Sequence, residues 1–310
     1  MKIVVVGSLN MDLVVRMPQI PRPGETLLGG VFKTFPGGKG ANQAVTAARL
    51  GAEVALIGCV GDDSFGQSLR ATLANENIDT THVLVRPGEA TGVALIQVDA
   101  KGQNSIAVAS GANFSLTSGD VEKAMQAIGD FDVLVMPLET PLETIYTAAQ
   151  IAAQKGIKVL LNPAPAQVLE TDLLELVDVL LPNEHEVALM TDIPLQSAAD
   201  TRRAAEKLLL MGAKNLLVTL GSQGARLFDG KTYQETFLPA YPVQAVDTTA
   251  AGDCFVGALA VGISEGKNLL AAAEFASAAA ALSVTRAGAQ PSLPDRNQVR
   301  QFISERNKTP

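Results

Sequence analysis

The run Ile3-Val-Val-Val-Gly7 decides the fold, because it is an uninterrupted apolar stretch that ends in glycine at the very start of the chain. A strand that is apolar on both faces has to be covered on both sides, which is typical of a parallel sheet packed between helices. Similar runs recur along the chain at Val54–Val60, Val133–Met136, Lys158–Leu161, Val177–Leu181 and Leu216–Leu220. The sequence therefore predicts a mostly parallel sheet that is buried on both faces.

Segments with the composition of helices lie between these strands. They are Ala41–Leu50, Ser64–Asn75, Leu142–Lys155, Ser197–Met211, Asp253–Ser264 and Leu269–Thr285. Strands that alternate with helices require right-handed crossovers, and so predict an α/β fold with a doubly wound, mostly parallel sheet flanked by helices. Ligands of such sheets bind beyond the carboxyl ends of the strands, so the loops there are where chemistry is expected.

Two segments, at about 11–35 and 89–110, depart from this alternation. Strands with mixed faces are predicted there over Asp12–Met17, Glu25–Phe32, Thr91–Val98 and Asn104–Ala109. They predict a small, mostly antiparallel sheet inserted in the main one, as a lid, a dimer surface or both. The alternative is a pair of surface hairpins without function. No repeat, linker or change in composition divides the chain, so we expect residues 1–310 to form one domain with this inserted lid.

The composition restricts the partners. With 47% hydrophobic and 18% charged residues, the 310-residue chain is typical of a compact globular protein. Its net charge of −8 argues against nucleic acid or an acidic membrane as a partner, and requires any nucleotide phosphate to be held by local groups. The two cysteines, Cys59 and Cys254, provide neither a disulfide framework nor zinc-ligand spacing. The first apolar run is too short for a signal peptide, so we expect a cytoplasmic protein.

The most informative stretch for function is Asp247-Thr-Thr-Ala-Ala-Gly-Asp253, which leads into the apolar run Cys254–Ala260. Small residues at a helix start let a ligand approach backbone N–H groups at the positive end of the helix dipole, where anionic oxygens bind. A carboxylate there fits a proton acceptor for a hydroxyl, while the N–H groups receive charge from a transferring phosphoryl group. The alternative is that Asp253 caps its helix and Asp247 is a solvated loop residue.

A second glycine-rich turn, Pro36-Gly-Gly-Lys-Gly-Ala-Asn-Gln-Ala44, precedes the first helix. It matches neither the phosphate-loop pattern nor the dinucleotide fingerprint. It offers backbone N–H groups and Asn42 to a polar ligand such as a polyol, or else it is an ordinary strand-to-helix turn. Asn10 and Asp12, two residues apart on an extended segment, point the same way and can bridge neighbouring hydroxyls, although such a pair is also common in turns.

Two later turns offer polar groups. In Leu181-Pro-Asn-Glu-His-Glu186, Asn183 and Glu186 share one face of a first helical turn. That face fits a second-shell Mg²⁺ site or, equally, an N-terminal capping motif. The turn Thr219-Leu-Gly-Ser-Gln-Gly224 lets backbone approach a nucleotide, although turns of this kind are frequent.

Together these motifs resemble the PfkB carbohydrate kinase family, with the match extending over essentially the whole chain. The resemblance rests on Gly37–Asn42, Asn162-Pro-Ala-Pro-Ala166, Pro182–Glu186 and Asp247–Asp253, in that order, and on Ala281–Ser292. One departure is Ala250, where the common family pattern has glycine. The resemblance implies ATP-dependent phosphorylation of D-ribose at its 5-hydroxyl. The alternatives are a family kinase for deoxyribose, a nucleoside or another sugar, or a sugar- or nucleotide-binding protein without catalysis.

The resemblance also implies roles for individual residues. Asp253 would be the base, and the amides of Ala250, Ala251 and Gly252 the anion hole. Ribose would be held by Asn10, Asp12, Gly38, Lys39, Asn42, Glu139 and Asp253. The ATP pocket would be lined by Asn183, Thr219, Leu220, Gly221, Ser222, Gln223, Gly224, Gly252 and Ser277. Glu186 would contact Mg²⁺ through water. A monovalent cation, expected to be K⁺, would be held by Asp247, Thr249, Ser283, Arg286, Gly288 and Ser292. Two subunits would pair through their lid sheets.

Overall fold

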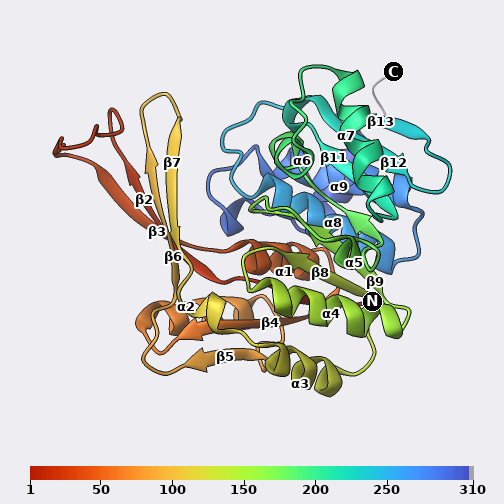
Figure 1. Ribbon diagram of the computed structural model, residues 1–310. Coiled ribbons are helices and arrows are strands. Elements are labelled where there is room, and N and C mark those ends of the chain that lie inside the picture. The colour runs from red at the N-terminus through yellow and green to blue at the C-terminus, as the bar shows by residue number, and fades with distance from the viewer. Residues whose placement is uncertain (307–310) are drawn as a thin grey trace.

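A computed structural model describes residues 1–306 and shows one nine-stranded sheet between two layers of helices, with a second, smaller sheet projecting from it (Figure 1). In spatial order the main sheet runs β13-β12-β11-β10-β9-β8-β1-β4-β5. The strand bounds in chain order are β1 Lys2–Val6, β4 Glu53–Gly61, β5 Val83–Arg86, β8 Val133–Pro137, β9 Lys158–Asn162, β10 Val179–Leu180, β11 Asn215–Thr219, β12 Gly224–Asp229 and β13 Glu235–Pro239.

The sheet is built outward from β1 in both directions. The chain passes from β1 to β4 and β5 on one side, then returns to β8 and continues to β9, β10 and β11 on the other, and all these neighbours are parallel. Only β12 and β13 add in antiparallel fashion. The predicted doubly wound fold is therefore confirmed. Its switch point lies between β1 and β8, which places the segments that follow these strands at the expected ligand-binding edge.

The apolar run at the chain start is explained by two cores. Ile3 and Val5 point into a core shared with α1, α2, α8, α9 and α10, whereas Val4 and Val6 point into a second core shared with the helices from α3 to α7. Alternate residues of one strand thus face opposite helical layers, so neither face has room for polar side chains. The helices are α1 Lys39–Arg49, α2 Ser64–Asn75, α3 Ser118–Ile128, α4 Leu142–Gln154, α5 Thr171–Leu174, α6 Glu184–Thr191, α7 Ala198–Leu210, α8 Ala251–Ser264, α9 Leu269–Ser283 and α10 Arg296–Arg306.

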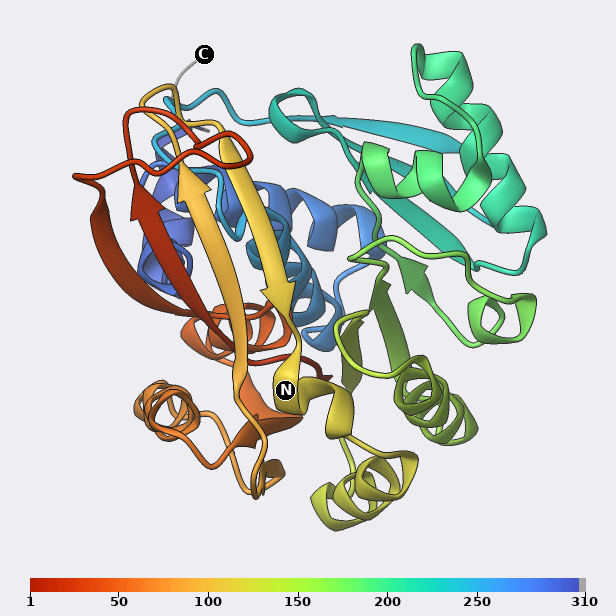
Figure 2. The ribbon, with the colours of Figure 1, turned by 60° about the vertical axis from the view of Figure 1, so that its left-hand side comes forward.

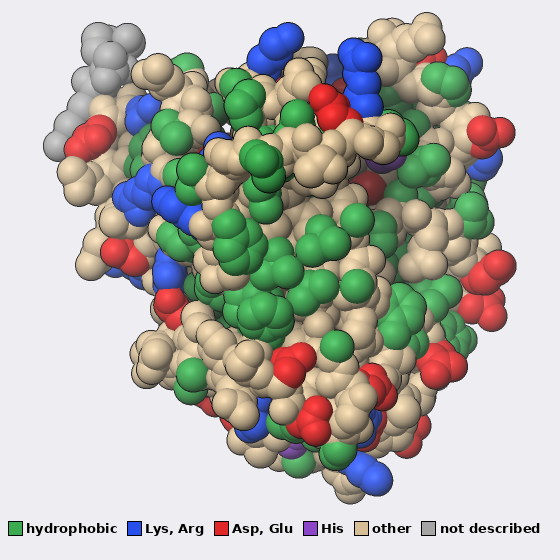
Figure 3. Space-filling view, turned by 90° about the vertical axis from the view of Figure 1, so that its left-hand side faces the viewer, with side chains coloured by type: hydrophobic (Ala, Val, Ile, Leu, Met, Phe, Trp, Pro, Cys, Tyr) green, Lys and Arg blue, Asp and Glu red, His purple; other side chains and the backbone are tan. Residues whose placement is uncertain are grey.

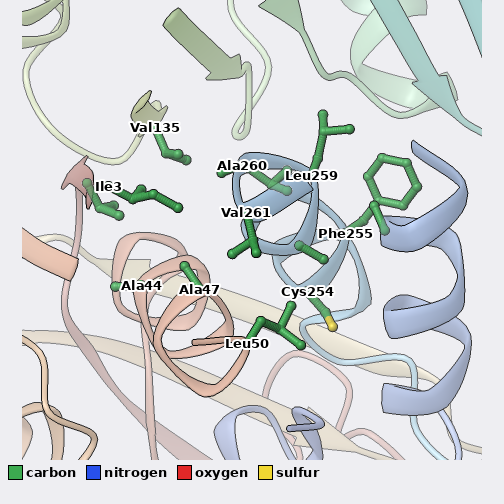
Figure 4. Packing of buried hydrophobic residues seen from close by; sticks show 14 of the residues in the cluster. Ile3, Ala44, Ala47, Leu50, Val135, Cys254, Phe255, Leu259, Ala260 and Val261 are labelled. Atoms are coloured by element: carbon green, nitrogen blue, oxygen red, sulfur yellow. The ribbon is translucent and has the colours of Figure 1, made fainter. Parts of the chain in front are cut away.

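Helices α1 and α8 pack closely beneath the sheet, because both present small residues to each other. Figure 4 shows Ala44 and Ala47 of α1 near Ala260 and Val261 of α8. A Cβ on Gly257 of α8 would lie 2.6 Å from the carbonyl oxygen of Gln43. This close approach brings the start of α1 against the start of α8, although the two segments are more than two hundred residues apart in the sequence.

The second sheet has the order β3-β2-β6-β7, with β2 Asn10–Arg16, β3 Val31–Gly37, β6 Gly92–Val98 and β7 Asn104–Ala109. It is antiparallel except between β2 and β6 (Figure 2). The predicted strand over Glu25–Phe32 is wrong, because the third strand begins at Val31 and continues to Gly37. Leu28 is 92% exposed and Gly29 has a φ of 91°, so the segment before Val31 has neither a buried face nor strand geometry.

Several elements were not expected from the sequence or are shorter than expected. The run Val177–Leu181 contributes only the two residues of β10 to the sheet. Strands β5, β12 and β13 and helices α3, α5 and α10 were not anticipated, because they are short or their apolar residues are interrupted by polar ones. Three short 3₁₀ turns complete the described chain: Gly111–Ser115, Gly221–Gln223 and Gln290–Ser292. Within residues 1–306, none of the helices combines the length and apolarity that crossing a membrane requires.

Candidate active site

Helix α8 begins without a side-chain cap. Its N-cap residue, Ala250, has left-handed backbone geometry with φ 60°, and no side chain in the described part of the chain accepts a hydrogen bond from the first turn. The N–H of Ala251 donates to the Thr248 carbonyl at 3.2 Å, whereas those of Gly252 and Asp253 find no acceptor among residues 1–306. A Cβ on Gly252 would meet nothing within 4 Å. The first turn of α8 therefore offers free donors and open space to an anionic oxygen.

Asp253 does not cap α8, so that alternative is wrong. It is the third helical residue and only 6% exposed, and its carboxylate points toward α1. There Oδ2 accepts a hydrogen bond from Nδ2 of Asn42 at 2.9 Å, and Oδ1 accepts one from Nε2 of Gln43 at 3.2 Å. Both donors are neutral amides, so the carboxylate is oriented without being neutralised by a cation in direct contact.

A pocket of about 230 Å³ opens beside the start of α8. Eight of the residues that line it were named from the sequence: Lys39, Asn183, Glu186, Thr219, Ala250, Ala251, Gly252 and Asp253. Thr248, Asn162, Ala164, Leu181, Phe255 and Val256 complete the lining. The turn before α1, the start of α6 and the start of α8 thus meet at one cavity.

The residues expected to hold a sugar form a cluster on the other side of Asp253. Gly38 begins α1 with a φ of 91°, and a Cβ there would lie 2.7 Å from the backbone nitrogen of Asn10. Oε2 of Glu139 accepts hydrogen bonds from the Ser8 hydroxyl and from the Lys39 N–H, the latter at 3.2 Å. Asn10 and Asp12 are buried at the start of β2, as is Asn42 in α1. All these residues lie at the switch point or beside it.

This cluster concentrates negative charge. Burial, with Glu139 and Asp253 nearby, raises the pKa of Asp12 to about 7. Burial alone would lower the pKa of Lys39, but Asp253, Glu139 and Glu186 outweigh it and raise that pKa. Lys39 is therefore held as a cation between the carboxylates, facing the pocket that the start of α8 lines.

The start of α6 is closed by its own side chains, as the capping alternative expected. Asn183 Oδ1 accepts from the Glu186 N–H at 2.9 Å, while Oε2 of Glu186 accepts from the Asn183 N–H at 2.8 Å. Oε1 of Glu186 accepts from Nδ2 of Asn183 at 2.9 Å. Burial raises the pKa of Glu186. Each carboxylate oxygen keeps acceptor capacity toward the pocket, which fits a contact to hydrated Mg²⁺ through water but not a direct, multidentate site.

The remaining residues assigned to ATP lie in three places. Thr219 pairs with Asn183 and donates its N–H to the Pro182 carbonyl at 3.0 Å, so it reaches the pocket. Leu220, Gly221, Ser222, Gln223 and Gly224 form the turn between β11 and β12 and do not line it. Ser277 also lies outside it, in a second hollow formed by 236–242 together with Leu270 and Glu274.

Of the residues expected to hold K⁺, Asp247, Thr249 and Gly288 are joined by hydrogen bonds. Oδ1 of Asp247 accepts from the N–H and hydroxyl of Thr249, and Oδ2 accepts from the Gly288 N–H at 3.0 Å. The hydroxyls of Ser283 and Ser292 donate to carbonyls of their own turns, and the Ser283 hydroxyl also contacts the thiol of Cys254. The N–H of Arg286 donates to the Ser283 carbonyl, which ties its loop to α9. Carboxylate, hydroxyl and carbonyl oxygens are the ligand types that suit a weakly hydrated cation, although the guanidinium of Arg16 also lies 3.9 Å from Oδ2 of Asp247.

Two buried amides at the site were missed from the sequence. Gln43 and Asn162 contact each other between Asp253 and β9, at 3.2 Å from Gln43 Nε2 to Asn162 Oδ1. Both occur in the motifs quoted above, but glycine and lysine drew attention in the first, and proline in the second. Their type was the available signal, because amide side chains beside apolar residues are seldom buried without hydrogen-bond partners.

Comparison with known proteins agrees with this geometry. The sequence profile of the pfkB family carbohydrate kinase matches residues 1–296. A ribokinase of Haemophilus influenzae is 44% identical over 299 residues, which cover 96% of this chain and 97% of that protein. A deoxyribokinase of Salmonella typhimurium is 39% identical over 305 residues, covering 98% and 99%. A solved structure of Arabidopsis thaliana ribokinase complexed with ribose and ATP superposes with a TM-score of 0.89 at 33% identity, covering 97% and 98% of the two chains.

Proposed function

The chain belongs to the pfkB family of carbohydrate kinases, and from that premise we propose that it transfers the γ-phosphoryl group of ATP to the 5-hydroxyl of D-ribose. It is an ATP-dependent sugar kinase with the fold of the ribokinases. The observation that carries the proposed chemistry is the position of Asp253. On one side of its carboxylate lie buried side chains that could bind sugar hydroxyls. On the other side lies a helix start with free N–H donors.

In the proposed reaction Asp253 accepts the proton of the sugar hydroxyl as the hydroxyl oxygen forms a bond to the γ-phosphorus. The bond from that phosphorus to the bridging oxygen of ADP breaks on the opposite side. The free N–H groups of Gly252 and Asp253, together with the Lys39 ammonium, face the charge that spreads over the phosphoryl oxygens. The N–H of Ala250 also has no acceptor among residues 1–306 and stays part of the proposed anion hole, whereas Ala251 contributes a donor only if its bond to Thr248 opens.

The sugar would be held by Asn10, Asp12, Gly38, Asn42 and Glu139, whose acceptors match hydroxyl donors. The phosphates of ATP would run from the start of α8 past Asn183 and Thr219. The turn Leu220–Gly224 and the hollow at Ser277 would take the nucleoside. Mg²⁺, which neutralises phosphate charge when bound, would be reached through water by Glu186. K⁺ at Asp247, Thr249, Ser283, Arg286, Gly288 and Ser292 would stabilise the backbone that precedes α8.

The second sheet would act as a lid and as a dimer surface. It carries exposed apolar residues on both faces, among them Phe32, Leu95, Ile106 and Val108. Figure 3 shows hydrophobic side chains gathered on this side of the molecule. Pairing with the same sheet of a second copy would cover one face and its strand edges, while the other face closes over the sugar and excludes water. Two buried free thiols, Cys59 and Cys254, are compatible with a reducing, cytoplasmic location.

A coupled assay of ADP release tests the function, with ribose, deoxyribose, fructose and adenosine compared at one ATP concentration. We expect the highest kcat/KM with ribose and a steep loss of rate when K⁺ is replaced by Li⁺. Faster turnover of deoxyribose would instead assign the enzyme to the activity of its Salmonella relative. No release of ADP with any sugar would leave a binding protein on the same fold.

A further inference from the structure

The side chain of Gln43 occupies a position that the proposed reaction does not yet use. It lies in the second turn of α1, is completely buried, and its Nε2 is 3.2 Å from Oδ1 of Asp253 and 3.2 Å from Oδ1 of Asn162. An amide nitrogen has two hydrogens, so both are committed, one to each oxygen. We propose that Gln43 is a positioning residue that holds the catalytic carboxylate of Asp253 in its reactive orientation.

A backbone group determines which way these amides point. Nδ2 of Asn162 donates to the carbonyl oxygen of Leu181 at 2.9 Å, and a carbonyl only accepts. Asn162 must therefore turn its Oδ1 toward Gln43, and Gln43 must answer with its NH₂ group. The orientation passes from the end of β10, through the end of β9, to the start of α8. Asp253 thus receives a donor whose direction is set by the main sheet.

The two oxygens of Asp253 then have different tasks. Oδ1 is held from α1 by Gln43, on a path that leads away from the pocket to the main sheet. Oδ2 contacts Asn42, which belongs to the residues expected to bind the sugar, so this oxygen is the one that a sugar hydroxyl can approach. A carboxylate fixed at one oxygen loses its rotational freedom at the other, which is the pre-organisation that proton transfer needs.

The surroundings of Asp253 make a neutral donor valuable. The charged groups whose fields couple to it are Asp12 from β2, Lys39 from α1 and Glu186 from α6, and Glu139 lies beside Lys39. Two carboxylates, Asp12 and Glu186, and the Lys39 ammonium therefore act on the base from three different elements. An N–H donor to Oδ1 adds to the stabilisation of the ionised form without adding a cation that would compete for the phosphate.

The inference rests on the proposed function, and the experiment separates the two. If the wild-type enzyme releases no ADP with any sugar, the proposed function is wrong, and this is known before any variant is made. With turnover established, Gln43→Met keeps the volume but removes both donors, and Gln43→Glu keeps the shape but replaces the donor with an acid. Thr46→Val is the matched control, because Thr46 is equally buried one turn later on α1 and touches α8 but not Asp253.

For Gln43→Met we expect kcat to fall by about 10- to 100-fold, the KM for ribose and the affinity for ADP to stay within about twofold, and the acidic limb of the kcat–pH profile to move to higher pH. In Gln43→Glu a protonated acid can still donate, so activity should be retained best at low pH and fall as pH rises, the opposite slope. Thr46→Val should leave the pH profile unchanged.

Two results would overturn the assignment. One is a Gln43→Met enzyme with wild-type kcat and a superimposable pH profile. The other is a loss of kcat, ribose affinity and Tm in parallel, matched by Thr46→Val, because that pattern belongs to packing between α1 and α8 and not to the base. Melting curves of all three variants accompany the kinetics.

Discussion

The two sides of Asp253 differ in the hydrogen-bonding groups that they leave unused. Toward the second sheet lie mainly acceptors: the carboxylates of Asp12 and Glu139, and Oδ1 of Asn42, which is buried without a donor among residues 1–306. Toward α8 lie donors: the free N–H groups of Gly252 and Asp253 and the ammonium of Lys39. Sugar hydroxyls can donate hydrogen bonds, and phosphate oxygens accept them. The sugar is therefore expected on the acceptor side and the phosphates on the donor side, with the base Asp253 between them.

A second contrast shows how the donor side stays open. Helix α6 starts at the same pocket but satisfies its first turn with the reciprocal Asn183–Glu186 capping box. Helix α8 starts with Ala250 and no side-chain cap. A cap stabilises a helix by about 1 kcal/mol, so its absence in α8 is a cost in stability that keeps N–H groups available for a ligand.

A substitution of Asp253, which lies between the two sides, should have the largest effect on turnover. Asp253→Asn keeps the shape of the side chain but replaces one acceptor oxygen with an NH₂ group, so the proton acceptor is lost. We expect kcat to fall by about 10²- to 10⁴-fold, while ribose and ATP dissociation constants from calorimetry change little. A variant with near-normal turnover would remove Asp253 from the role of base and, with it, the distinction between the two sides.

The donor side is tested by filling its open space. Gly252→Ala places a methyl group where nothing lies within 4 Å, in the space next to the free N–H groups. We expect kcat/KM for ATP to fall by about 10²-fold with Tm unchanged, since access to the donors is lost but the helix is not.

Gly262→Ala, later on the same helix, is the control for that change. Its Cβ would lie 2.8 Å from Cβ of Ala272 in α9, so it should lower Tm while the folded enzyme keeps its turnover. If both glycine variants lost stability and kept activity, the space at Gly252 would have no part in phosphate binding.

The acceptor side is tested with Asp12→Asn. Losing a charged acceptor for a sugar hydroxyl should raise the KM for ribose by about 10- to 100-fold with a smaller change in kcat.

The same variant carries a pH signature in stability. The pKa of Asp12 is raised from 3.8 to about 7, so the folded state binds this proton more tightly than the unfolded chain does. The resulting contribution to stability is present below about pH 4 and is lost as pH rises to about 7, by an amount on the order of a few kcal/mol. Asp12→Asn should therefore gain more in Tm over wild type at pH 8 than at pH 4.5, and an equal difference at both pH values would contradict the crowding of carboxylates.

The smallest effect is expected at the start of α8. Ala250 holds a φ of 60°, a conformation that costs an L-residue about 1–2 kcal/mol, while glycine gives back about 0.5–1 kcal/mol in the entropy of the unfolded chain. Ala250→Gly should therefore raise the free energy of unfolding by up to about 1 kcal/mol, seen in a denaturant titration, with kcat within about twofold of wild type. A loss of stability would show that the turn is not strained by its side chain.

Much of the fold could be predicted from the sequence because its signals are local. Apolar runs such as Ile3–Gly7 indicate strands that are buried on both faces. Their alternation with helices indicates parallel strands joined by right-handed crossovers. The antiparallel strands β12 and β13 could not be predicted in this way, because polar residues interrupt their apolar ones, and neither could the exposed segment before Val31. The departure from glycine at residue 250 was visible in the sequence, but its left-handed backbone was not.

For the site, the sequence by itself determined which chemical groups are present: Asp253 beside small residues, Lys39 among glycines, and Asn183 with Glu186 three residues later. Only the tertiary structure decided what each group does with its hydrogen bonds. It showed that Glu186 closes its own helix, that Asp253 caps nothing, and that Gln43 and Asn162 connect the base to the sheet. The physical reason is that the residue types of a site can be read from the sequence, whereas the partners of Asp253, Gln43 and Asn162 lie far away in the chain and meet them only in the packed structure.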